Sequence, residues 1–498
     1  MSYTTQRRLD PVARPLRLRP IMWVTRPRRC LLAVVIGLAM TLVSTPASVP
    51  ARAAPEQPPA GTQVSSERTL RLDSIEIYGN THIKDATVLS YIQLSPGDPV
   101  DAAILESARR RLLDTDHFNR VELSTRPGQL RGAVVLILEL DERSRLSFET
   151  GFGYHDLNGW FLTLLGMRID NPLGIESRLR VGLRVGFRLS GIDAEWETPT
   201  SLSRRFGVVL KVEAYNNNHL FFGSGPGAPQ AWAGRDWRRF DQDIGRVAGE
   251  IGVHYQVNQQ TRATLGFRGQ VSEPDSSFMD RGNDIDYRFD DLPGSLRSDL
   301  GKIVVNGVFL RLLRDSRDIN VYPASGSFLS LTMQANTDVL GSDRSFVKAG
   351  VDLRKYLAFG ERKTLSGRVK SGYITDNPPY YERFYLGGNY SIRGFEEYSL
   401  SPTDGDDAYW FANLEMRVPL THRGHPAPWL TGLLFVDVGQ GWRRADSFSV
   451  DDVKSAVGYG VRVKLPWLGT LGIDAGVPLT SASTDDRFRV HALLGFSF

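Results

Sequence analysis

The chain has 498 residues, of which 41% are apolar, and its mean hydropathy is −0.24. This composition excludes a helical membrane protein, and the length leaves room for more than one domain. Nine of the 60 basic residues and one of the 56 acidic residues lie in the first 53 positions, so the remainder carries 51 against 55 and a formal charge of −4. Basic composition therefore gives no argument for nucleic-acid binding by that remainder.

An apolar run near the N-terminus, Cys30 to Val43, follows several arginines. It is too short to span a bilayer as a helix, and Ala51-Arg52-Ala53 supplies a small-residue cleavage site. We therefore predict that residues 1–53 are a secretory signal peptide with a long Arg-rich leader; a start at Met22 would leave a conventional signal. Because Cys30 is the only cysteine, its removal would exclude a disulfide framework or a thiolate metal site from the mature chain.

A small domain is predicted to follow a linker. The proline-rich residues 54–69 have no packable face and are predicted to be that linker. The elements predicted next are a strand from Leu70 to Ile77, a helix over Val88–Leu94, a helix over Ala102–Asp114, and strands over Phe118–Leu123 and Val134–Leu140. This order predicts a small α+β domain over residues 70–142, with helices on one face of a sheet.

From Leu146 onward the sequence alternates between apolar and polar residues. The clearest strand is predicted over Arg178–Leu189, where alternate positions carry four arginines. A water-filled lumen can hydrate such a face, whereas a soluble sheet rarely encloses it. Long polar stretches, Asn216–Asp243 and Ser272–Asp299, are predicted to be surface loops. At about 22 residues per strand and loop, residues 144–498 predict a transmembrane antiparallel β-barrel of about 16 strands, so the whole chain is mainly β.

One segment between two predicted strands stands out because it pairs a permanent cation with a flexible hinge and an aromatic ring: Ile392-Arg393-Gly394-Phe395. Arg393 cannot shed its charge and needs a carboxylate. Alternation along the following strands puts Glu415 and Asp437 on lumen-facing positions, together with Asn413 and Arg417. A folded-in Arg393 could reach both carboxylates; the alternative is that they are solvated lumen charges without a special partner.

Several motifs resemble a known family. Ile77-x-Gly79-Asn80, Leu94-x-Pro96-Gly97 and Phe118-x-x-Val121 resemble one POTRA domain, and Leu386–Tyr398 resembles the sixth-loop motif of the BamA-like outer-membrane superfamily of bacterial surface antigen type. The resemblance implies that this loop folds inside the barrel and that Glu415 and Asp437 anchor Arg393. It also implies that Phe496 and Phe498, on the outward face of the last predicted strand, form a C-terminal assembly signal.

Candidate enzyme sites are weak. His422-x-x-His425 has no adjacent carboxylate or thiol at ligand spacing, and Asp404-Gly405-Asp406-Asp407 lacks the remaining ligands of a calcium loop. No nucleophile elbow, phosphate-binding loop or dinucleotide fingerprint occurs in a suitable context. The sequence therefore predicts no enzyme, no catalytic residue, no metal and no cofactor.

The resemblance implies an outer-membrane protein with its POTRA-like domain in the periplasm. Its expected partners are unfolded outer-membrane or secreted polypeptides, outer-membrane lipid, and periplasmic chaperones or accessory lipoproteins, but no nucleic acid. The function predicted first is the assembly or insertion of outer-membrane proteins. Export of a dedicated passenger, as in two-partner secretion, is the alternative, and a passive porin comes third because it would not need the small domain.

Overall fold

The structure is a computed structural model. It describes residues 70–114, 117–155, 159–172, 177–198, 200, 205–222, 239–276, 278–280, 285–287, 294–318, 322–359, 363–421, 429–443, 448–465, 469–480 and 488–494. The predicted signal peptide and linker, the His422 and His425 pair, and the terminal Phe496 and Phe498 lie outside these residues. No helix in the described part of the chain is long and apolar enough to cross a membrane.

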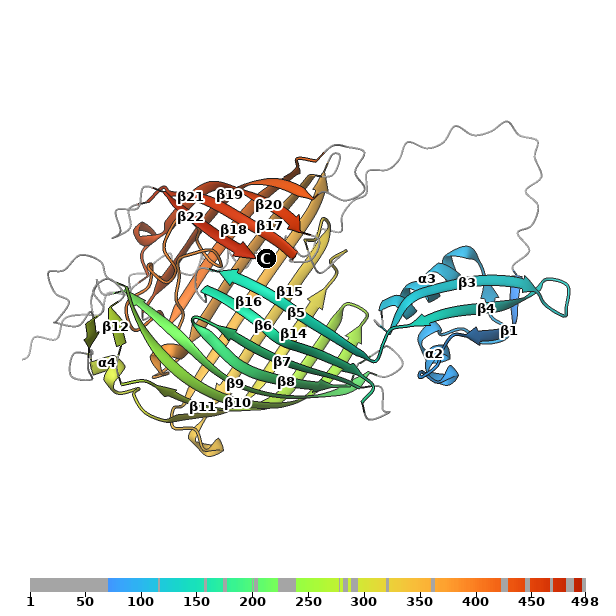
Figure 1. Ribbon diagram of the computed structural model, residues 1–498, viewed down its shortest axis with the longest axis horizontal. Helices are drawn as coiled ribbons and strands as arrows, with labels where there is room; N and C mark the ends of the chain where they lie inside the picture. Colours follow the sequence, from blue (N-terminus) through green and yellow to red (C-terminus); the bar gives the residue numbers. More distant parts are fainter. Residues whose placement is uncertain are drawn as a thin grey trace, which may run out of the picture. The chain divides into compact units, whose positions relative to one another are not determined.

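The first described region is a small α+β domain (Figure 1). Its elements are β1 (Leu70–Tyr78), α2 (Asp85–Ile92), β2 (Pro99–Val100), α3 (Ala102–Asp114), β3 (Phe118–Pro127) and β4 (Ala133–Glu142). The sheet order is β2-β1-β4-β3, with β1 parallel to β4. Helical spacing predicted that Leu94 belongs to the first helix, but α2 ends at Ile92 because Gln93 adopts the left-handed conformation; Leu94 still packs in the core.

The core of this domain is a single apolar cluster between the helices and one face of the sheet. Its fully buried members include Val88 and Ile92 of α2, Leu112 of α3, and Leu136 and Leu138 of β4. Alternation along the strands and the helical repeat of apolar residues bury the same side of each element. The domain therefore has its own hydrophobic core.

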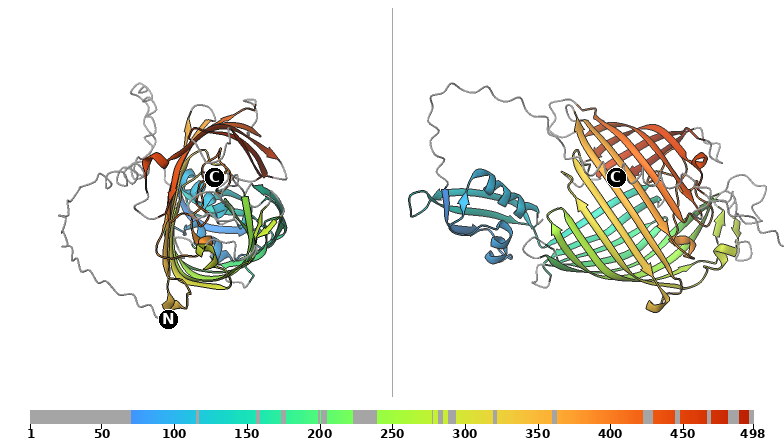
Figure 2. Two further views of the ribbon diagram at one scale, coloured as in Figure 1. Left: turned by 90° about the vertical axis from the view of Figure 1, so that its left-hand side faces the viewer. Right: turned by 180° about the vertical axis from the view of Figure 1, so that it is seen from behind.

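Sixteen strands of the described chain form a closed antiparallel barrel, which agrees with the predicted number (Figures 1 and 2). They are β5 (Leu146–His155), β6 (Gly159–Asp170), β7 (Arg178–Gly186), β8 (Leu189–Glu197), β9 (Phe206–Phe222), β10 (Arg239–Asn258), β11 (Thr261–Pro274), β14 (Ile303–Asp315), β15 (Gly326–Asn336), β16 (Phe346–Phe359), β17 (Lys363–Ile374), β18 (Ala408–Pro419), β19 (Leu430–Trp442), β20 (Lys454–Leu465), β21 (Gly469–Pro478) and β22 (Arg489–Leu494). A short hairpin, β12 (Phe278–Asp280) with β13 (Ile285–Tyr287), and helix α4 (Gly294–Arg297) lie between β11 and β14.

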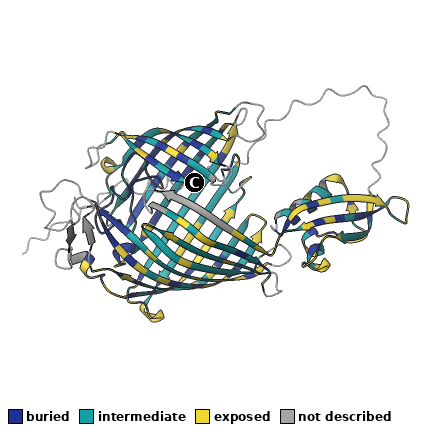
Figure 3. Cartoon of the chain, in the orientation of Figure 1, coloured by how far each residue is buried: buried dark blue, intermediate teal, exposed yellow. Residues whose placement is uncertain are grey.

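Along the barrel strands, exposed and buried positions alternate (Figure 3). Leu414, Leu434 and Val436 are exposed on the outside, whereas Glu415 and Asp437 are completely buried on the inside. Among the four arginines predicted in the lumen, Arg178 forms an ion pair with Asp170, and Arg180 forms one with Glu195. The wall thus carries apolar residues outward and many of its charges in cross-strand pairs inward.

Two predictions about strand ends are wrong. The strand predicted over Arg178–Leu189 ends at Gly186, and Leu189 begins β8. The Ser190 hydroxyl hydrogen-bonds both the N–H and the C=O of Gly186 and closes a short turn that alternation alone cannot reveal.

The predicted surface loops are also shorter than expected. β9 continues to Phe222, β10 begins at Arg239, and β11 continues to Pro274, so polar residues that were predicted to lie in loops are part of the ladder. Beyond the lipid both faces of a strand can be polar, and the apolar alternation that marks a membrane-spanning strand disappears while the backbone pairing continues.

Candidate functional site

A long segment, residues 375–407, connects β17 to β18 and folds into the barrel. We call it the internal loop. Its tip is deeply buried: Ile392 and Phe395 are 0% exposed and Arg393 is 1% exposed. Ile392 and Phe395 pack with Tyr409, Phe411 and Ala456 of the barrel wall. The apolar residues on either side of Arg393 therefore seat the tip against the wall and exclude water from the charge between them.

Arg393 is held by carboxylates from three strands. Its Nε donates to Asp437 Oδ2 at 2.7 Å and its Nη2 to Asp437 Oδ1 at 2.8 Å, a bidentate pair with β19. Its Nη1 donates to Glu415 Oε1 of β18 at 2.6 Å and to Asp474 Oδ2 of β21 at 3.4 Å. The backbone N–H of Arg393 also donates to Asp437 at 3.0 Å. The structure thus brings together the three residues that the sequence analysis grouped, and it adds Asp474.

Further side chains neutralise and shape this site. Arg462 of β20 forms a bidentate pair with Asp474, and Arg417 donates to Glu415 Oε2 at 3.0 Å. Three buried arginines thereby meet three buried carboxylates, which is the condition under which charges tolerate burial. The guanidinium carbon of Arg393 also lies 3.7 Å from the centre of the Phe435 ring, a cation–π contact.

Gly394 is required where the tip meets the wall. Its φ is +89°, a conformation that other residues rarely adopt. A Cβ on Gly394 would come within 3.2 Å of Ala456 of β20, and one on Gly476 of β21 would come within 2.6 Å of the Gly394 nitrogen. Two glycines therefore face each other, and the backbone of the tip lies directly on the backbone of β21.

The other end of the internal loop is held mainly by aromatic packing. Tyr380 and Tyr381 of the short helix η4 (Tyr380–Glu382) pack with Phe221, Ile244 and Leu296. The Tyr380 hydroxyl donates to Gln242, and the Tyr380 N–H donates to Asp299 at 2.9 Å. We call this cluster the aromatic anchor and the Arg393 network the ionic anchor.

Charged residues next to the aromatic anchor are also paired. Burial raises the pKa of Glu382, but Lys348 and Arg246 lower it more, so that the pKa is about 2. Glu382 accepts from Lys348 at 3.1 Å and from Gln270 at 2.9 Å. This carboxylate is therefore charged at any physiological pH and ties the internal loop to the barrel strands β11 and β16.

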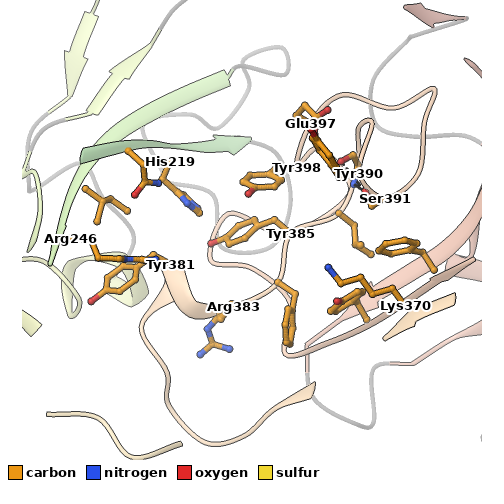
Figure 4. A pocket seen from close by; sticks show the side chains of 17 residues that line it. His219, Arg246, Lys370, Tyr381, Arg383, Tyr385, Tyr390, Ser391, Glu397 and Tyr398 are labelled. Carbon is orange, nitrogen blue, oxygen red and sulfur yellow. Dashed lines mark hydrogen bonds between the residues drawn. The ribbon is translucent and has the colours of Figure 1, made fainter. Parts of the chain in front are cut away.

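Between its two anchors the internal loop leaves a cavity of about 380 Å³ against the wall (Figure 4). Tyr385 and Tyr398 of the loop lie beside His219 of β9, and Lys370 of β17 lies on the other side. The His219 and Tyr385 rings are 4.7 Å apart, edge to face. The middle of the internal loop is thus less tightly packed than its ends.

Two carboxylates of the Asp404–Asp407 segment form ion pairs with arginines. Asp404 pairs with Arg443, and Asp407 pairs with Arg383. Burial raises the pKa of Asp406 to about 7, although the hydrogen bond from Ser401 and the nearby Arg443 lower it. Within the described residues, no group of three or more His, Cys, Asp and Glu side chains could hold a metal ion.

The barrel closes where β22 pairs with β5. Among the described residues β22 pairs with β5 only through Leu493 with His155 and Leu494 with Tyr154. By comparison, β5 pairs with β6 from Leu146 to His155. We call the contact of β22 with β5 the seam.

The chain matches the models of two known protein families. The model of the Omp85 superfamily domain matches residues 171–498, and a POTRA model described as surface antigen variable number repeat matches residues 70–143. The chain belongs to the Omp85 superfamily. The family recognised from the sequence is therefore confirmed, as is a mainly β fold with one POTRA domain before the barrel.

Curated relatives of this Omp85 protein include outer membrane protein assembly factor BamA of Nitratidesulfovibrio vulgaris, which is 25% identical over 432 residues, 84% of this chain and 49% of that protein. Sorting and assembly machinery component 50 homolog A of Xenopus laevis is 30% identical over 138 residues, 26% of this chain and 29% of that protein. The chain thus spans about half the length, or less, of these two relatives.

Solved structures share the fold of this Omp85 protein. BamA from Haemophilus ducreyi lacking POTRA domains 1–3 has a TM-score of 0.59 at 17% identity, covering 86% of this chain and 84% of that one. CdiB from Acinetobacter baumannii has a TM-score of 0.54 at 16% identity, covering 86% and 73%. The Omp85 protein is located in the cell outer membrane, with its POTRA domain in the periplasm, as the sequence predicted.

Part of the ionic anchor was not predicted from the sequence. Asp474, Arg462 and Phe435 received no role, although each occupies an inward position on its strand. A signal for Asp474 is present in Gly460, because a Cβ there would meet Asp474 Oδ1 at 1.9 Å. Glycine opposite an inward carboxylate marks a side chain that needs room.

Proposed function

We propose that this Omp85 protein inserts or assembles outer-membrane β-barrel proteins and that it acts without enzymatic chemistry. The observation that carries the proposal is the seam. Among the described residues two pairs join β22 to β5, whereas β5 pairs with β6 from Leu146 to His155. We propose that the seam opens and that the backbone N–H and C=O groups of β5 then pair with a strand of another chain. An incoming strand could pair there and be carried laterally into the lipid.

The POTRA domain supplies a second edge that fits an extended client. In the four-stranded sheet β3 pairs with β4 on one side and is the last strand of the described sheet on the other. Its residues from Glu122 to Pro127 are mostly exposed. Such an edge can bind an extended chain through main-chain hydrogen bonds with little sequence selectivity.

The internal loop argues against a passive porin. It lies across the lumen with an ionic anchor on β18, β19 and β21 and an aromatic anchor near β9 and β10. We propose that Ile392, Arg393, Gly394 and Phe395, docked on Glu415 and Asp437, keep the C-terminal strands in register while the seam exchanges partners. We also propose that Phe496 and Phe498 direct the protein's own assembly.

Reconstitution tests this function directly. Vesicles containing the full-length mature protein should accelerate folding of a urea-denatured eight-stranded outer-membrane barrel, measured by its heat-modifiable gel shift, relative to empty vesicles. Vesicles containing a variant that lacks Leu70–Asp141 should lose the acceleration although the barrel itself still folds, because the two parts have separate cores. Equal activity of the two proteins would disprove docking at the POTRA domain.

The same vesicles separate assembly from export. Export of a dedicated passenger predicts that a secreted polypeptide crosses into the vesicle lumen and becomes protected from added protease, with no acceleration of barrel folding. Assembly predicts faster barrel folding and no protected passenger. Faster folding by neither the full-length nor the truncated protein would reject the assembly function.

A further inference from the structure

The last strand, β22, carries a row of inward residues that contacts the internal loop. Arg489, His491 and Leu493 are spaced by two residues and so share one face of the strand. Leu493 is 1% exposed and His491 is 0% exposed, whereas Val490 between them is exposed to the outside. This row, which we call the inner row of β22, points into the barrel next to the seam.

Two of the three residues bind the tip of the internal loop. The backbone N–H of Gly394 donates to His491 Nε2 at 3.1 Å, across 97 positions in the sequence. Arg489 Nη2 lies 3.0 Å from Glu396 Oε2. The positions bound, 394 and 396, flank the buried Phe395, so the inner row contacts the tip immediately after Arg393.

The tip of the internal loop packs closely against the wall. Gly394 and Gly476 face each other without room for a Cβ, and the N–H of Gly394 donates to His491, so the tip is held against both β21 and β22. His491 lies opposite Asp474, which contacts both Arg393 and Arg462. One connected set of polar contacts therefore runs from the ionic anchor to the strand that closes the barrel.

From these contacts we infer that the inner row of β22 is a latch: His491 and Arg489 fasten the closing strand to the internal loop, and release of the loop weakens the seam. This inference rests on the proposed function, because the seam is the edge offered to clients. The latch holds β22 from inside the barrel. The contacts of His491 with Gly394 and of Arg489 with Glu396 add to the pairs that β22 makes with β5.

His491 and Arg489 act as positioning residues with different tolerance. His491 is buried and accepts a hydrogen bond from a backbone N–H that would otherwise be unsatisfied. We therefore expect the contact to require a hydrogen-bond acceptor at position 491 and not an imidazole ring. The side chains of Arg489 and Glu396 are 29% and 20% exposed, so their pair is weaker and partly hydrated. Exchanging the two charges should preserve their pair.

A buried thiol reports opening of the seam strand. Protein expressed as residues 54–498 lacks Cys30, so Leu493→Cys places its only cysteine on the inner row, and reaction of this thiol with a water-soluble maleimide requires local opening. His491→Leu together with Arg489→Gln should raise the labelling rate about fivefold, the change expected from about 1 kcal/mol of lost hydrogen bonding.

Conservative variants and a matched control distinguish the latch from general loosening. His491→Gln keeps an acceptor and should label at nearly the parent rate, and Arg489→Glu with Glu396→Arg should label more slowly than either single change. His254→Leu is the control, because His254 is also a buried inward histidine but hydrogen-bonds Thr264 within the wall at 2.8 Å. It should leave the labelling rate of Leu493→Cys unchanged.

The latch and the proposed function fail differently. Unchanged labelling in His491→Leu with Arg489→Gln, in protein that retains its heat-modifiable fold, would overturn the latch even if vesicles still accelerate client folding. An equal rise in His254→Leu would also overturn it. Faster labelling without any change in client folding would keep the latch and reject the seam as the assembly site. If His491→Leu does not fold, the charge exchange at positions 489 and 396 decides alone.

Discussion

The two anchors of the internal loop hold it by different physics. The ionic anchor joins Arg393 to Asp437, Glu415 and Asp474 through directional bonds of 2.6 to 3.4 Å in a fully buried setting. The aromatic anchor packs Tyr380 and Tyr381 against apolar residues with few polar contacts. Directional bonds between buried charges fail when one partner is removed, whereas apolar packing tolerates changes that keep volume.

This difference predicts which end of the loop is more sensitive to a single substitution. Breaking a buried ion pair leaves an uncompensated charge and typically costs about 3 to 5 kcal/mol. Removing a hydroxyl from a packed ring costs about 1 kcal/mol. The ionic anchor is thus the more sensitive attachment, and it is the one next to the seam.

The largest effect is expected from Arg393→Ala, which breaks the ionic anchor completely. Three carboxylates would lose their shared cation, so the tip should leave the wall while the strands persist. Limited proteolysis should cut within residues 375–407, and the temperature of the heat-modifiable transition should fall by several degrees. Arg393→Lys should rescue little, because an ammonium cannot reproduce the planar two-pronged pairing.

Arg180→Ala is the matched control for this change. Arg180 is also a lumen arginine, but its side chain is 48% exposed and it pairs with Glu195 and Glu197 away from the loop. Loss of this arginine should change the transition little, since exposed pairs contribute at most about 1 kcal/mol. Equal effects of the two substitutions would contradict the special role of Arg393.

A second comparison ranks the carboxylates inside the ionic anchor. Asp437 accepts three hydrogen bonds from Arg393, including one from its backbone N–H, whereas Glu415 accepts one from Arg393 and shares its other oxygen with Arg417. Asp437→Asn should therefore release the loop more than Glu415→Gln. Protease sensitivity of the two isosteric variants measures this order, and the reverse order would contradict the assignment of Asp437 as the main partner.

The aromatic anchor should respond more mildly. Tyr380→Phe keeps the ring among Phe221, Ile244 and Leu296 and removes only the hydrogen bond to Gln242. We expect destabilisation by about 1 kcal/mol and no new proteolytic site in the tip. A loss comparable to that of Arg393→Ala would mean that the two anchors do not differ in kind.

The smallest effect concerns pH. The pKa of Asp406 is about 7 in the folded loop against an ordinary 3.8, so the folded protein favours the protonated carboxyl. The stabilisation is complete below pH 4, falls as the pH rises, and is lost above about 7. The ionisable groups that lie around this carboxyl are those of Asp404, Arg383 and Arg443.

Proteolysis of residues 375–407 at two pH values checks this prediction. The loop should be cut faster at pH 8 than at pH 5. Asp406→Asn cannot ionise but can still accept from Ser401, so its cutting should depend less on pH. The same pH dependence in parent and variant would assign the effect to another group.

Some features could be predicted because they depend on local chain geometry. Alternation of side chains along a strand has a period of two, so it predicted that Glu415 and Asp437 point inward, and the structure has both fully buried in the lumen. Helical spacing predicted α3 over Ala102–Asp114, with the same bounds as observed. The sixteen strands likewise follow from the length and repeat of the alternating segment.

Other features depend on which strands become neighbours. Alternation cannot tell that Asp474 on β21, Phe435 on β19 and His491 on β22 converge on one loop tip, because the internal loop folds against the wall and meets residues up to 97 positions away. The short turn after Gly186 and the extension of β9 to Phe222 were also invisible, since hydrogen-bond partners in other strands decide where pairing stops. The sequence determined which faces are polar, and the tertiary structure decided which charges meet, because a barrel pairs residues through space and not through spacing along the chain.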